Sequence, residues 1–255
     1  DEADRMLDMG YTEDGDRVCA LAPAARQTVL FAATIDGAIG RLAAGLTSDA
    51  VRIEIGAERS SPVAIEQRVH FADDRAHKYR LLDHLLADVG TGQSIVFIAT
   101  KRDAEALANK LQDEGHTAAA LHGDMNQRDR DRTLTRLRRG GVRTLVATDV
   151  AARGLDVPGV THVINFDLPR QAENYLHRIG RTGRAGATGV AVSLANPAER
   201  GTLRQIERYT GASIPAHVIP GLEPRPRNQN ATVRRPQRGG MMNAKAGSPR
   251  WRAGR

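Results

Sequence analysis

The chain has 255 residues, of which 40% are hydrophobic, enough for one large domain or two modest ones with a packed core. No run of about 18 apolar residues occurs, which excludes a membrane-spanning helix and a membrane as partner. The single Cys19 excludes an internal disulfide and fits a reducing compartment, so we expect a cytoplasmic protein.

The net charge of +7 is concentrated near the C-terminal end. Residues 221–255 hold nine Lys or Arg residues and one acid, Glu223, so this segment carries +8 and residues 1–220 carry −1. Such a basic segment favours binding to a phosphate polymer. The alternative is a solvated tail with no dedicated partner. Because the segment lacks apolar periodicity, it is predicted to be disordered.

The first part of the chain predicts two helices and two short strands. Residues 3–9 and 36–46 have the apolar spacing of helices, whereas residues 27–32 and 51–55 have the composition of strands. The polar stretch 56–62 that follows is predicted to be a linker.

The second part predicts strands that alternate with helices. Strands are expected at residues 65–71, 94–98, 118–121, 143–147, 162–166 and 189–194. Helices are expected at residues 75–86, 103–111, 127–137, 173–179 and 197–209. This alternation predicts an α/β fold with a parallel sheet covered on both faces. Ligands of such folds bind in the loops at the carboxyl ends of the strands.

Acidic residues open the chain at Asp1-Glu2-Ala3-Asp4. Carboxylates at a strand end suit a Mg²⁺–triphosphate, because one Asp holds the metal through water and an adjacent Glu orients an attacking water. On their own, these four residues indicate no more than an acidic helix start, which the helix dipole favours.

Three later segments carry further candidate chemistry. Residues 30–34 are a strand end with one hydroxyl, on Thr34, and residues 147–156 combine a hydroxyl, two carboxylates, an arginine and a glycine. Residues 177–184 contain arginines separated by glycines. Two of them, Arg181 and Arg184, can converge on one phosphate, and an arginine aimed at a transferring phosphoryl group is worth about 10³–10⁵ in rate. The alternative is a solvated basic turn.

Taken together, these segments resemble the DEAD-box RNA helicase family in order and approximate spacing. The matching residues are DEAD at 1–4, AAT at 32–34, ATDVAARGLD at 147–156 and HRIGRTGR at 177–184. The resemblance implies the C-terminal portion of a first RecA-like, ATP-binding domain at residues 1–58. A second RecA-like helicase C-terminal domain would span 59–212, and a basic disordered tail 213–255. The opening residues, the Ile-Pro-Gly near residue 220 and the tail are similar to the bacterial RhlE-type branch.

The resemblance also implies roles for individual residues. Glu2 would position the hydrolytic water, and Arg181 and Arg184 would be the arginine fingers. ATP would be bound by Asp1, Gly154, Asp156, Arg181 and Arg184, with Asp1 holding Mg²⁺ through water. The ATP and RNA sites would be coupled by Asp4, Thr34 and His177. RNA would be bound through its sugar–phosphate backbone, independently of sequence, by Thr100, Gly123, Gln127, Arg130 and Thr148.

Two departures from the family pattern are visible. Ala32 stands where the family usually has Ser, which leaves open a weaker coupling of ATP hydrolysis to strand separation. No Lys follows a Gly, so the phosphate-gripping loop is missing from this sequence. The start at Asp1 suggests a truncated chain, which we expect to be inactive alone.

The parent protein is expected to be an ATP-dependent RNA helicase and RNA-stimulated ATPase that unwinds or remodels RNA duplexes. Ribosome-assembly and mRNA-decay factors are both open as partners. Two alternatives remain: a non-catalytic RNA-binding or annealing module, and a DNA helicase of the same superfamily.

Overall fold

The computed structural model describes residues 3–8, 10–32, 35, 37–54, 65–88, 92–155, 157–184 and 186–225, without the side chains of residues 4, 5 and 8. The chain divides into two compact units, residues 1–59 and residues 60–255. None of the helices described is long and apolar enough to cross a membrane.

The described part of the first unit contains the helices α1 (Ala3–Asp8), α2 (Thr12–Leu21) and α3 (Gly37–Leu46). Helices α1 and α3 confirm the prediction, whereas α2 was not predicted. No residue of α2 is buried, so it lacks the apolar spacing on which helix prediction depends. Glu13 and Asp14 in its first turn instead favour the helix through its dipole.

The strands predicted at residues 27–32 and 51–55 were wrong for every residue that is described there. A strand needs a neighbour to satisfy its backbone groups, and no ladder partner lies beside these segments in the described part of the unit. The larger apolar side chains Val29, Phe31, Val51 and Ile53 are exposed instead, with Phe31 at 62% and Val51 at 84%.

The second unit is built on a six-stranded sheet in the order β1-β6-β5-β2-β4-β3, with all pairs parallel. The strands are β1 (Ile65–Phe71), β2 (Gln93–Phe97), β3 (Ala118–Leu121), β4 (Thr144–Ala147), β5 (Val160–Asn165) and β6 (Gly189–Ala195). All six predicted strands are confirmed: the bounds of β1 and β3 are as predicted, and those of the other four shift by at most two residues.

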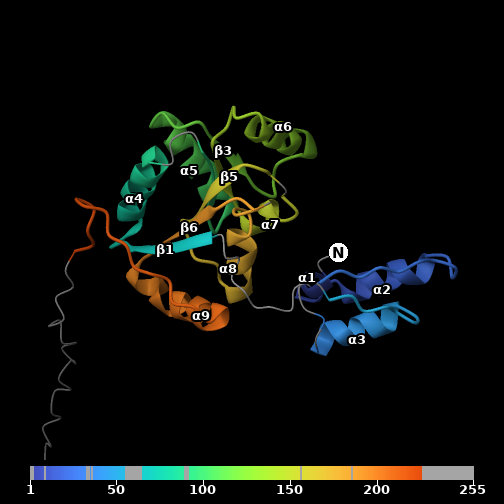
Figure 1. Ribbon diagram of the computed structural model, residues 1–255. Helices are drawn as coiled ribbons and strands as arrows, with labels where there is room; N and C mark the ends of the chain where they lie inside the picture. The colour runs from blue at the N-terminus through green and yellow to red at the C-terminus, as the bar shows by residue number, and fades with distance from the viewer. Residues whose placement is uncertain are drawn as a thin grey trace, which may run out of the picture. The chain divides into compact units, whose positions relative to one another are not determined.

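Helices cover both faces of this sheet (Figure 1). They are α4 (Arg75–Asp88), α5 (Lys101–Asp113), α6 (Gln127–Arg138), α7 (Asp149–Ala152), α8 (Ala172–Ile179) and α9 (Arg200–Thr210), with the 3-10 turn η1 (Pro197–Glu199) before α9. Alternate residues of β2 enter opposite core layers. Val96 packs with α4 and α5, whereas Ile95 and Phe97 pack with α6 and α7. This double burial explains why the central strands carry apolar runs such as Ile95–Phe97 in β2 and Leu145–Ala147 in β4.

The segment after α9 covers part of the outer edge of β1. Val69 N–H donates to the Pro215 carbonyl at 2.9 Å, and His217 N–H donates to the Val69 carbonyl at 2.8 Å. Ile214 and Ile219 are buried beside these bonds. Residues 214–219, which belong to the predicted tail, are therefore packed at the edge of β1, and the Leu222 carbonyl lies 3.0 Å from His77 Nε2 of α4.

Candidate nucleotide- and RNA-binding site

Three of the predicted RNA-contacting residues follow three neighbouring strands of the sheet. Thr100 lies after β2, Gly123 after β3 and Thr148 after β4, and these strands are adjacent in the order β2-β4-β3. Because the strands are parallel, all three residues lie at the same edge of the sheet, here called the carboxyl edge. Thr100 and Gly123 are exposed and Thr148 is 7% exposed.

Thr100 is held in place as the N-cap of α5. Its hydroxyl accepts from Asp103 N–H at 3.1 Å and donates to Asp103 Oδ2 at 2.6 Å. The other carboxylate oxygen of Asp103 accepts from Arg75 Nη2 at 2.8 Å. Asp103 thereby connects Thr100, in the loop after β2, to Arg75 at the start of α4.

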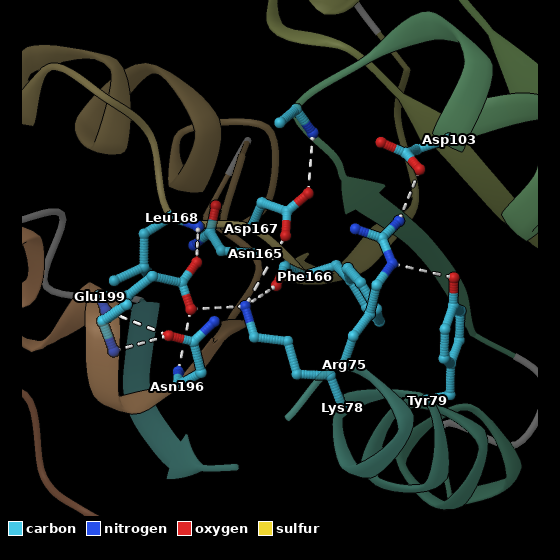
Figure 2. Close-up of polar contacts among 12 residues, drawn as sticks. Arg75, Lys78, Tyr79, Asp103, Asn165, Phe166, Asp167, Leu168, Asn196 and Glu199 are labelled. Atoms are coloured by element: carbon cyan, nitrogen blue, oxygen red, sulfur yellow. Dashed lines mark hydrogen bonds and ion pairs between the residues drawn. The ribbon is translucent and has the colours of Figure 1, made fainter. Parts of the chain in front are cut away.

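A buried ammonium group ties the same loop to the rest of the carboxyl edge (Figure 2). Lys78 Nζ donates to the Phe166 carbonyl at 2.7 Å and lies 2.6 Å from Glu199 Oε2 and 3.7 Å from Asp167 Oδ1. Asp167 Oδ2 accepts from Ala99 N–H at 3.0 Å. A buried charge requires such counter-charges, so Lys78 fixes the ends of β2, β5 and β6 relative to one another.

The two predicted RNA-contacting residues of α6 lie at its start. Gln127 is exposed and donates to Asp131 Oδ1 at 2.8 Å. Arg130 Nη2 donates to the Ala151 carbonyl at 2.6 Å, which brings its guanidinium beside the loop and helix that follow Thr148.

Helix α8 carries a buried arginine, Arg178, that was not among the predicted site residues. Its Nε and Nη2 donate to the two carboxylate oxygens of Asp149 at 2.6 and 2.8 Å. Its Nη1 donates to Asn165 Oδ1 at 3.0 Å and to the Asp167 carbonyl at 2.6 Å. The guanidinium also lies 4.9 Å from the centroid of the Phe97 ring. Arg178 therefore links α8 to the loops after β4 and β5.

The spacing of residues on α8 could have indicated this position. Tyr175, Arg178 and Ile179 are separated by three and four residues and share the buried face of the helix, while His177 is exposed. Burial also raises the pKa of the Tyr175 phenol, whose hydroxyl donates to Gln67 Oε1 at 2.8 Å.

The two predicted arginine fingers lie just beyond α8. Arg181 Nη1 donates to the Leu155 carbonyl at 2.7 Å, and Arg184 Nε donates to the Gly180 carbonyl at 2.8 Å. Arg181 thus reaches the turn that contains Gly154, whose φ of +61° suits glycine. Both arginines are half-buried.

The loop that carries these arginines is held by a close approach of two backbone segments. Thr182 is buried and donates to the Val160 carbonyl at 2.6 Å. A Cβ on Gly189 would lie 2.5 Å from Thr182 Oγ1 and 2.7 Å from the Gly183 nitrogen, so the approach requires a glycine there.

The remaining predicted site residues lie outside the described residues. These are Asp1, Glu2, Thr34 and Asp156, together with the side chain of Asp4 in α1. Among the described residues, no group of three or more His, Cys, Asp or Glu could hold a metal ion.

Comparisons with known proteins agree with this geometry. Residues 77–186 match the helicase conserved C-terminal domain. The chain is 42% identical over 226 residues to the ATP-dependent RNA helicase SrmB of Haemophilus influenzae, covering 88% of this chain and 52% of that protein. The chain thus spans about half the length of the curated relatives it matches.

Solved structures show the same relationship. The DEAD-box protein SrmB of Escherichia coli, bound to regulator of ribonuclease activity A, is 46% identical with a TM-score of 0.62 over 64% of this chain and 96% of that one. Dbp5 of S. cerevisiae, bound to RNA and ADP BeF3, is 36% identical with a TM-score of 0.75 over 85% of this chain and 58% of that one.

The sheet order and the loops at its carboxyl edge define a RecA-like helicase domain. With the similarity to SrmB over nearly all of its solved chain, the protein belongs to the DEAD-box family.

Proposed function

We propose that the protein to which this chain belongs is an ATP-dependent RNA helicase that couples RNA-stimulated ATP hydrolysis to local unwinding or remodelling of RNA duplexes. The observation that carries the proposal is the shared carboxyl edge of Thr100, Gly123 and Thr148, beside which Arg181 is hydrogen-bonded to the turn after α7. The names of the relatives support it, since SrmB is called an ATP-dependent RNA helicase and a Dbp5 structure contains RNA and ADP BeF3.

The proposed roles follow the family motifs. Asp1 would hold Mg²⁺ through water, Glu2 would orient the hydrolytic water, and Gly154 and Asp156 would contact ATP. Arg181 and Arg184 would stabilise charge on the transferring phosphoryl group. Asp4, Thr34 and His177 would couple ATP to RNA. The RNA backbone would meet Thr100, Gly123, Gln127, Arg130 and Thr148.

The proposed domain organisation keeps residues 1–58 as the end of a first RecA-like domain and 59–212 as the second. Residues 213–255 would form a basic extension, of which residues 214–219 pack on β1. The lone Cys19 supports a cytoplasmic location. We further propose that the protein belongs to the RhlE-type branch of the family and acts in ribosome assembly or mRNA decay.

The test is the ATPase rate of the whole protein with and without RNA. We expect RNA to stimulate hydrolysis, and Arg181→Gln or Arg184→Gln to lower the stimulated rate by about 10³-fold or more. RNA affinity without nucleotide should stay unchanged in both variants. Arg204→Gln, which removes an exposed arginine of α9, is the matched control and should keep the full rate.

An ATPase rate that RNA leaves unchanged would contradict the helicase proposal. If the protein then accelerated annealing of complementary RNA strands without ATP, the non-catalytic RNA-binding alternative would replace it.

A further inference from the structure

Helix α6 carries an exposed row of arginines on the side away from the core. Arg128, Arg132 and Arg136 follow one another at intervals of four residues, so they lie along one line of the helix surface, about 6 Å apart along its axis. Arg139, the C-cap residue, is exposed too and continues the line three residues further. The opposite face of α6 is buried through Thr133, Leu134 and Leu137.

The acids of α6 are hydrogen-bonded to neutral side chains at the start of the helix and not to the arginines of this row. Asp129 accepts from Asn126 Nδ2 at 2.8 Å, and Asp131 accepts from Gln127 Nε2 at 2.8 Å. Both carboxylates are therefore engaged with residues at the start of the helix. In the described part of the chain, no ion pair joins Arg128, Arg132 or Arg136 to a carboxylate.

The stability of α6 does not account for the row. Like charges four residues apart on a helix cost about 0.2–0.5 kcal/mol per pair. Arg128 lies in the first turn, where the helix dipole disfavours a positive charge, and only Arg136 lies in the last turn, where the dipole favours one. The arrangement of the row therefore brings its own helix little stability, which favours a ligand outside the helix.

The position of α6 favours RNA as this ligand. The helix starts four residues after Gly123, and Arg130 is hydrogen-bonded to the Ala151 carbonyl beside the loop of Thr148. The row therefore begins at the carboxyl edge and leads away from it, next to β3, the last strand of the sheet. RNA that leaves the edge on this side meets guanidinium groups.

We propose that Arg128, Arg132 and Arg136 bind the sugar–phosphate backbone of RNA that extends beyond the RNA-contacting loops, an inference that rests on the proposed function. A guanidinium group can donate two hydrogen bonds to the oxygens of one phosphate, and such contacts do not distinguish one base from another. The row lengthens the RNA-binding surface without adding sequence preference.

Helix α9 offers a matched control for this surface. Arg204 and Arg208 have the same four-residue spacing and are exposed, as Arg128 and Arg132 are. Helix α9 follows β6, which β5 separates from β2 and the other RNA-contacting strands. Replacing either pair by Gln removes the same charge from a surface helix, but only the α6 pair lies next to the strands β3, β4 and β2, whose loops carry the predicted RNA-contacting residues.

The experiment measures binding of fluorescent single-stranded RNA to the 255-residue chain by anisotropy over a range of salt concentrations. The variants are R128Q/R132Q, R204Q/R208Q and Thr148→Val. The probes are an oligouridylate of roughly six nucleotides and one of roughly twenty. We expect R128Q/R132Q to bind the longer probe about fivefold more weakly, with a salt slope shallower by about 1.4, and the shorter probe unchanged. R204Q/R208Q should match the unmodified chain with both probes.

Equal weakening by both arginine pairs would overturn the proposal in favour of non-specific charge. An effect of Thr148→Val without one of R128Q/R132Q would overturn it while the proposed RNA function stands. No effect of any variant on either probe would overturn both. Circular dichroism of each variant verifies that the fold is retained.

Discussion

At the scale of single residues, the carboxyl edge depends on buried charges rather than on exposed ones. Lys78 is 1% exposed and lies between Glu199 and Asp167. In the Lys101–Asp124 pair on the same edge, by contrast, both side chains are 60% exposed. An exposed pair contributes little to stability, but a buried group that loses its partner is left as an uncompensated charge.

This contrast predicts that replacing Lys78 lowers the stability of the protein far more than replacing Lys101. Lys78→Met should lower the free energy of unfolding by about 3 kcal/mol, because it leaves Glu199 without its counter-charge. Adding Glu199→Gln should restore at least about 1 kcal/mol of that loss. Lys101→Met should change stability by less than about 1 kcal/mol. Urea unfolding of the four proteins checks this, and equal losses for the two lysines would contradict it.

At the scale of elements, the reliability of the sequence predictions followed burial. Strands such as β2 and β4 are buried at nearly every position because both of their faces are covered, and their apolar runs were predicted correctly as strands. Helix α2 was missed because none of its residues is buried. The predicted strand at 27–32 failed because strand composition does not supply a pairing partner.

At the same scale, two glycines of helix α9 differ in backbone conformation and should respond in opposite ways to substitution by Ala. Gly201 lies inside the helix, and a Cβ there would meet nothing within 4 Å, so Gly201→Ala should stabilise the protein by about 0.5–1 kcal/mol. Gly211 ends the helix with φ +70°, so Gly211→Ala should destabilise it by about 1 kcal/mol. Thermal unfolding should move in opposite directions, and a shift in the same direction would contradict the assignment of the helix end.

At the scale of the whole molecule, the stability of the second unit is linked to pH through the covered edge of β1. His70 is 4% exposed, and its ring centroid lies 6.2 Å from that of His217 in the segment that follows α9. Burial, together with the positive potential of His217 and Arg68, lowers the pKa of His70 to about 4. The native state therefore disfavours protonation of this imidazole, while the unfolded chain accepts it.

The sign of the pH effect follows from this difference. A histidine with a pKa of about 4 when folded and 6.5 when unfolded contributes its full stability above pH 6.5 and loses it as the pH falls toward 4. The contribution should fall by about 2 kcal/mol between pH 7 and about pH 5. His70→Gln should flatten the dependence of unfolding free energy on pH in this window, and His84→Gln, on the exposed face of α4, should not. An unchanged slope in His70→Gln would refute the linkage.

The candidate site was predictable only where a motif marks it. The motifs led to Thr100, Thr148 and Arg181, and strand order explains why the two threonines share one edge. Helical spacing could have indicated that Arg178 is buried, but no motif indicated its partners or those of Lys78 in the loop after β5 and in η1, because those contacts join residues up to 121 positions apart, as in Lys78–Glu199. Long-range pairs of this kind are set by topology and not by local pattern.

The four hydrogen bonds of Arg178 have a mechanical consequence. One guanidinium joins α8 both to Asp149, the neighbour of Thr148, and to Asp167, whose carboxylate holds the residue before Thr100. Sliding α8 along the sheet would rupture all of these bonds together, so partial displacements are energetically unfavourable. We therefore expect helix α8 and the two loops to move together, so that a displacement of either loop also shifts the arginines beyond α8.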